Sequence, residues 1–200
     1  MWIGYTASST AIYFVITWTP QLVSTASGST ETGTLVGTMI SIGTFVAAIL
    51  FTLIVLRVSP TKVCWIAAAI AAIAQLAFAL TLTNGAAIAA AVLLGMSLQA
   101  VQAAYLASCT RLYPTLIRAR AEGLMMGLSR VGTILVPLLV GYVLSIIPPQ
   151  TMYLLASVFV VLAASAAFAL WSTTRRELEI PGEEPAAAEP GLVLPTPSGR

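Results

Sequence analysis

One arginine lies within an otherwise apolar stretch of this 200-residue sequence, and its side chain could bind an anion. Arg130 follows Glu122 by eight residues, which is about 12 Å along a helix. Placing an Arg near the centre of a membrane helix costs about 2.5 to 3.5 kcal/mol on insertion scales, so we expect it to face a cavity or a partner. Its planar guanidinium suits a carboxylate. The alternative is that Arg130 reaches the membrane interface or pairs structurally with Glu122.

Polar side chains recur on one face of the first apolar stretch. Thr6, Thr10, Tyr13 and Thr17 are spaced four, three and four residues apart, which is the spacing of one helix face. Thr10 and Tyr13 are therefore candidates for contact with a solute in a water-filled cavity. The alternative is that the threonine hydroxyls bond to their own helix and face any direction.

A second polar face is predicted further along the chain. Gln99, Gln102 and Tyr105 follow one another at intervals of three residues, so two amides and a phenol project from one side of a helix. Each amide needs several hydrogen-bond partners. Gln99 and Gln102 are candidates for substrate contact, although amides also commonly join helices to one another within membranes.

The groups needed for catalysis or metal binding are scarce. The sequence has no His and no Asp, and no pair of carboxylates lies in an apolar stretch, so acid-base, triad and metal chemistry lack their side chains. No Gly-Lys-Ser phosphate loop is present. We therefore expect no enzyme, no cofactor and no metal site. The positive charges are explained by membrane topology, so nucleic acid is not an expected partner.

The elements that would position these side chains are membrane-spanning helices. The composition is 58% hydrophobic and 8% charged, whereas soluble domains carry about a quarter charged residues. The apolar residues form six runs, each near the roughly 20 residues that cross a bilayer as a helix. The sequence thus predicts an all-α integral membrane bundle over residues 1–171, with spans at about 1–23, 35–56, 63–82, 86–108, 123–146 and 151–171.

The basic residues predict the orientation of this bundle. Positive charge near helix ends is retained on the cytoplasmic side. The second and fourth breaks and the segment after the sixth run carry the cations, whereas the first, third and fifth breaks carry none. The cations are Arg57, Lys62, Arg111, Arg118, Arg120, Arg175 and Arg176. We expect a multi-pass protein of the cell (plasma or inner) membrane with both ends in the cytoplasm, followed by a disordered Glu- and Pro-rich cytoplasmic tail over residues 172–200.

Several of these residues form a recognisable pattern. The fourth break reads Arg111-Leu-Tyr-Pro-Thr-Leu-Ile-Arg118, followed by Glu122-Gly, Ser-Arg130-Val-Gly and a later Pro and Gly; the first stretch contains Tyr13 and then Trp-Thr-Pro20. The pattern resembles the major facilitator superfamily, in the C-terminal six-helix half of its metabolite and aromatic acid:proton symporter branch. The resemblance covers about residues 1–171.

The resemblance implies transport of a small organic solute, with an organic or aromatic acid held near mid-membrane and Arg130 as a partner for its carboxylate. It also implies that Arg111, Arg118 and Glu122 help to close a cytoplasmic gate, although capping of helix ends would explain Arg111 and Glu122 equally. Where this family usually has Glu the sequence has Arg111, and the second break lacks the family's Asp and Gly, which weakens the gating charges.

A half-transporter needs a second half. The resemblance implies a partner that is an N-terminal six-helix half or a second copy, besides the lipid bilayer and a small-molecule substrate. The apolar pattern begins at the first residues, so we expect a missing upstream part. The alternative function is that of a non-transporting membrane subunit or a truncated, inactive transporter fragment.

Overall fold

The computed structural model describes residues 1–81, 87–143 and 148–179, and the regular elements within these ranges are six α-helices. All six predicted runs correspond to helices. In chain order they are α1 (Trp2–Ser27), α2 (Thr30–Val55), α3 (Pro60–Thr81), α4 (Ala87–Leu112), α5 (Thr115–Val143) and α6 (Pro149–Glu179). The predicted break at residues 83–85 lies outside the described residues.

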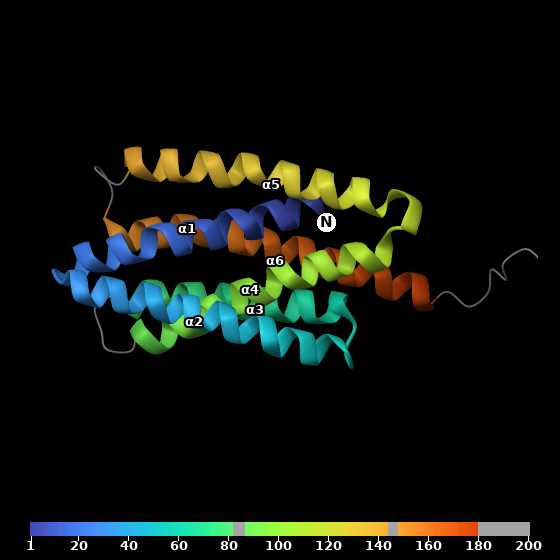
Figure 1. Ribbon diagram of the computed structural model, residues 1–200, viewed down its shortest axis with the longest axis horizontal. Helices are drawn as coiled ribbons and strands as arrows, with labels where there is room; N and C mark the ends of the chain where they lie inside the picture. The colour runs from blue at the N-terminus through green and yellow to red at the C-terminus, as the bar shows by residue number, and fades with distance from the viewer. Residues whose placement is uncertain (82–86, 144–147, 180–200) are drawn as a thin grey trace, which may run out of the picture.

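The helices run up and down in a bundle, with α5 at one side (Figure 1). α4 packs against both α2 and α3, and α6 packs against α3 and α1. α1 also contacts α2, α4 and α5, whereas α5 packs mainly on α1 and touches α4 only slightly. α1 therefore sits between α4 and α5, and polar groups on its face lie within reach of both helices.

Close contact between α2 and α4 depends on two glycines. A methyl group added at Gly95 would collide with the backbone carbonyl of Ile40, and one added at Gly43 would collide with that of Val92. The two helix backbones therefore touch through positions that have no side chain. Such small residues are common where membrane helices approach closely, because van der Waals packing replaces the hydrophobic effect there.

Five of the six helices are apolar and long enough to cross a membrane. These are α2, α3, α4, Thr115–Tyr142 of α5 and Thr151–Thr174 of α6. α1 is long enough but less apolar, because hydroxyl residues occupy many of its positions. Ser8, Ser9, Thr10 and Thr19 of α1 are buried in the bundle. Protein rather than lipid surrounds these hydroxyls, so hydropathy alone underestimates how well this helix fits a bundle core.

Two helix boundaries differ from the predicted ones. α5 begins at Thr115 rather than near residue 123, and α6 continues to Glu179 rather than ending near residue 171. Hydropathy marks where a chain enters hydrocarbon, but a helix continues through charged residues that favour it, such as Arg and Glu. The tail predicted from residue 172 therefore starts with helix; residues 180–200 lie outside the described residues.

Candidate functional site

Arg130 and Tyr13 are in contact, which links α5 to α1. Nη1 of Arg130 donates a hydrogen bond of 2.9 Å to the phenol oxygen of Tyr13, and the guanidinium carbon lies 6.0 Å from the centre of the Tyr13 ring. The second distance is at the limit of a cation-π interaction. Because α5 begins at Thr115 and ends at Val143, Arg130 is near its middle. The polar contact thus lies about halfway along α5.

Gln102 of α4 reaches the same helix from the other side. Its Nε2 donates a hydrogen bond of 3.2 Å to the hydroxyl of Ser9, which lies one turn before Tyr13 on α1. Gln99, one turn earlier on α4, is half-buried, and its side chain has no hydrogen-bond partner among the described residues. The side chains of Arg130 and Gln102 therefore both bond to α1, at Tyr13 and at Ser9. Ser9 was not among the predicted site residues. Its position four residues before Tyr13 was the available signal.

Tyr105, the third member of the predicted α4 face, points elsewhere. Its hydroxyl donates a hydrogen bond of 2.6 Å to the backbone carbonyl of Ala163 in α6, and the ring is fully buried. A methyl group added at Gly4 would collide with this hydroxyl, so α1, α4 and α6 meet here. Tyr105 thus holds three helices together, whereas the two glutamines remain partly accessible.

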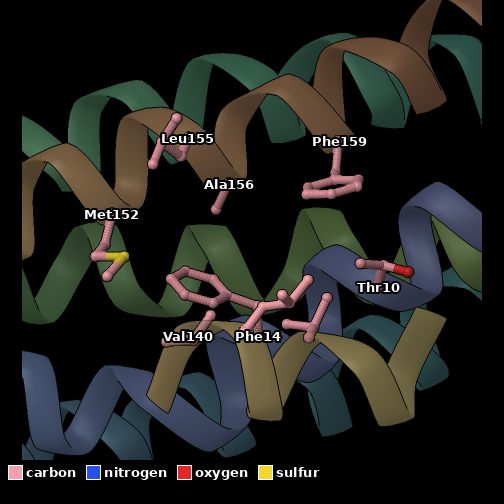
Figure 2. Close-up of a pocket in the computed structure, with 9 residues that line it drawn as sticks. Thr10, Phe14, Val140, Met152, Leu155, Ala156 and Phe159 are labelled. Carbon is pink, nitrogen blue, oxygen red and sulfur yellow. The ribbon is translucent and has the colours of Figure 1, made fainter. Parts of the chain in front are cut away.

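Thr10 also lies apart from the Tyr13–Arg130 contact. It is buried, and a methyl group added at Gly132 of α5 would collide with its hydroxyl. Figure 2 shows Thr10 at an apolar cavity of about 150 Å³ between α1, α5 and α6. The lining residues are Thr10, Phe14, Val136, Leu139, Val140, Met152, Leu155, Ala156 and Phe159. Thr10 and Tyr13, which were predicted to share one face of α1, therefore have different surroundings. Thr10 lies in the contact with α5, whereas Tyr13 is 39% exposed and lies beside Arg130.

Two polar atoms in the seam between α1 and α5 have no partner. The Thr6 hydroxyl and the Trp18 indole N–H are buried without a hydrogen bond to any described residue. Thr6 lies beside Gly132, and the Trp18 ring lies 3.6 Å from the Cβ position of Gly141. Buried polar groups normally have a hydrogen-bond partner, so these two atoms are places where a water molecule or a ligand could bind. They flank the Tyr13–Arg130 contact along the same seam.

The candidate gating charges lie where α4 turns into α5. Arg111 is exposed in the last turn of α4, a position where a cation suits the helix dipole, as predicted. Arg118 and Glu122 are half-buried, and Nε of Arg118 and Oε1 of Glu122 are buried atoms that accept or donate no hydrogen bond within the described part of the chain. The proposed capping role of Glu122 is wrong. Glu122 lies in the third turn of α5, beyond the first-turn range of the dipole.

Comparison with known proteins gives the family. A sequence profile described as Major Facilitator Superfamily matches residues 1–197. The chain is also similar to the 4-hydroxybenzoate transporter PcaK of Pseudomonas putida, with 29% identity over 136 residues; the match covers 68% of this chain and 30% of that protein. The chain thus spans under a third of this relative's length. No solved structure matches it. The chain belongs to the major facilitator superfamily and is a multi-pass membrane protein of a transporter family.

Proposed function

We propose that this chain is the C-terminal half of a secondary transporter that carries a small organic acid, of the aromatic acid:proton symporter branch. The observation that carries the proposal is Arg130, a cation near the middle of a membrane helix whose side chain remains exposed. An intramembrane charge of this kind marks a substrate or ion pathway by default. The transporter name of the relative PcaK supports the substrate class.

The hydrogen bond to Tyr13 leaves other donors of Arg130 free to bind an anion. A guanidinium has five N–H donors, and the phenol of Tyr13 takes one of them. The remaining donors can bind both oxygens of a carboxylate, which is the strong geometry for this pair. The amide of Gln99 and the amide of Gln102, which already bonds Ser9, would contact other polar atoms of the substrate. Thr10 is left out of this proposed site because it lies in the α1–α5 contact.

The missing wall of the site would come from an N-terminal six-helix half. Facilitators bind substrate between two halves near mid-membrane. Two observations support a partner. The chain spans 30% of PcaK, and α5 carries Gly123 and Gly127 with open space around their Cβ positions. Glycines four residues apart allow close approach of another helix. A second copy of the chain is the other partner that this face would fit.

The proposed orientation has six spans and both ends in the cytoplasm, with Arg111, Arg118 and Glu122 at the gate on that side. The α2–α3 and α4–α5 connections and the end of α6 lie at the same end of the bundle (Figure 1), and the basic residues follow this pattern. A cysteine replacing Thr83 should react with an impermeant thiol reagent outside intact cells, whereas one replacing the exposed Lys62 should not. The reverse labelling would refute this orientation.

Selectivity for an anion tests the transport proposal. We expect 4-hydroxybenzoate to inhibit uptake by the whole transporter at least tenfold more strongly than 4-hydroxybenzamide, which has the same ring without the charge. A hydrogen bond to a charged group contributes about 1.5 to 3 kcal/mol, or roughly 10- to 100-fold. The measurement is competition against a radiolabelled aromatic acid in cells. Equal inhibition by acid and amide would contradict an Arg-based anion site.

A further inference from the structure

A long apolar groove runs along α4 between α2 and α3. Both of these helices pack on α4 but make few contacts with each other, which leaves a cavity of about 450 Å³ between them. The small side chains of Ala47, Ala67 and Ala100 are among its lining residues. Its one lining hydroxyl, that of Ser97, donates to the carbonyl of Leu94 at 3.1 Å within its own helix. The groove therefore offers no free polar side chain to an occupant.

The groove opens toward the surroundings of the bundle. Ile54 of α2 and Ile66 of α3 line opposite walls, and their side chains are 45% and 46% exposed. α2, α3 and α4 are each apolar and long enough to cross a membrane, so the surrounding phase along the groove is hydrocarbon. A cavity of about 150 Å³ holds benzene, and this one has roughly three times that volume.

Two basic residues, Arg57 and Lys62, lie at the end of the groove, near the connection between α2 and α3. Val58 and Val63 line the cavity, and Arg57 and Lys62 are their immediate chain neighbours. Both basic side chains are exposed, and within the described residues neither has an ion pair or a hydrogen-bonded side-chain partner. Among the carboxylates whose side chains the structure describes, Glu31 lies in the first turn of α2 and Glu122 lies in α5. Neither of them forms an ion pair with Arg57 or Lys62, so no carboxylate of this described set neutralises the positive charge at this mouth.

We propose that this groove binds an anionic phospholipid, with one acyl chain between α2 and α3 and the phosphate held by Arg57 and Lys62. The apolar wall of the groove matches the acyl chain of such a lipid, which lies in the hydrocarbon. The two cations match its phosphate, which lies at the membrane surface. Basic clusters next to membrane helices attract anionic headgroups. A free phosphate would gain nothing from the groove, and a zwitterionic lipid would gain little from the charges. The site lies away from Arg130 and does not depend on the proposed substrate.

Native mass spectrometry of the purified chain in a non-ionic detergent tests the charged part of this site. We expect phosphatidylglycerol to bind more tightly than phosphatidylcholine with the same acyl chains. Each cation near an anionic membrane surface contributes about fivefold in affinity, so Arg57→Gln with Lys62→Gln should lose roughly 25-fold for phosphatidylglycerol and little for phosphatidylcholine. Arg111→Gln is the control, because Arg111 is exposed at the same end but neither it nor its chain neighbours line the groove. Equal loss in the control would overturn the proposal, because it would indicate only a general charge effect.

A second variant tests the acyl-chain part. Ala100→Phe fills the groove and should weaken phosphatidylglycerol binding while Arg57 and Lys62 remain. Ala89→Phe, at an exposed position of the same helix, should leave binding unchanged. Soluble glycerol phosphate should not displace the lipid. Displacement at equal concentration would show a plain phosphate site, and unchanged binding in Ala100→Phe would place the lipid elsewhere; either result refutes the proposal. The Arg57 and Lys62 variants lie at exposed positions, so the charged arm remains informative if Ala100→Phe does not fold.

Discussion

Replacing Arg130 by Gln in the assembled transporter is expected to lower the ratio of maximal uptake rate to KM for an aromatic acid by about 10- to 100-fold. Gln keeps a polar side chain of similar reach but removes the charge and the bidentate donors. A hydrogen bond to a charged group contributes about 1.5 to 3 kcal/mol, which sets this range. The measurement is initial uptake in cells across substrate concentrations, normalised to the amount of transporter in the membrane.

Three further variants separate substrate binding from structural support. Arg130→Lys keeps the charge without the planar fork, so it should fall between the parent and Arg130→Gln. Tyr13→Phe removes only the acceptor of the 2.9 Å hydrogen bond, and we expect a loss of about 2- to 10-fold. Arg120→Lys, at an exposed position of the same helix, is the matched control and should transport normally. Uptake that is normal in Arg130→Gln would exclude a role for this residue in recognising the anion.

The contact between Tyr13 and Arg130 illustrates what sequence periodicity can and cannot predict. Spacing placed Tyr13 on a polar face of its helix, and the cost of a membrane-buried charge indicated that Arg130 faces a cavity or a partner. Which partner it has depends on how α1 and α5 pack, and that is set by contacts such as Thr10 against Gly132. The same spacing did not predict that the hydroxyl of Thr10 lies against Gly132, because a helix in a bundle has neighbours on several sides.

The boundaries of α5 show a second limit. The apolar pattern resumes near residue 123, but Pro114 immediately precedes a helix that starts at Thr115 and includes Arg118. Pro is favoured at helix starts, and this was a signal in the sequence for the earlier boundary. Hydropathy instead reports the depth of the chain in the bilayer. The consequence for the site is direct, since Arg130 lies near the middle of a longer helix, not one-third of the way along a shorter one.

The purified chain alone is expected to show no uptake driven by a proton gradient. Coupling needs a membrane-embedded group that gains and loses a proton near working pH, normally a carboxylate or His. The sequence has neither His nor Asp. Among the Glu residues, Glu31 lies in the first turn of α2 and is exposed, Glu177 and Glu179 lie at the end of α6, and three more fall within residues 180–200. Arg130 cannot exchange the proton, because a guanidinium stays protonated in proteins.

Glu122 is the one carboxylate that could change this expectation. It is half-buried in α5, and its Oε1 is a buried atom without a hydrogen-bond partner among the described residues. It lies two turns before Arg130, however, on the side of α5 nearer its start. We therefore expect the coupling carboxylate to come from the N-terminal half, which would also supply the facing wall of the cavity.

Reconstitution into vesicles distinguishes these sources of the carboxylate. Vesicles with the 200-residue chain alone, under an imposed proton gradient, should accumulate 4-hydroxybenzoate no faster than protein-free vesicles, whereas co-reconstitution with an N-terminal half should give gradient-dependent uptake. Glu122→Gln in the two-half protein should retain proton coupling if the carboxylate lies in the other half. Accumulation by the lone chain that is lost in Glu122→Gln would overturn the half-transporter proposal, because it would indicate a complex of identical copies that couples through Glu122. Absence of uptake with both halves present would instead favour a non-transporting membrane subunit.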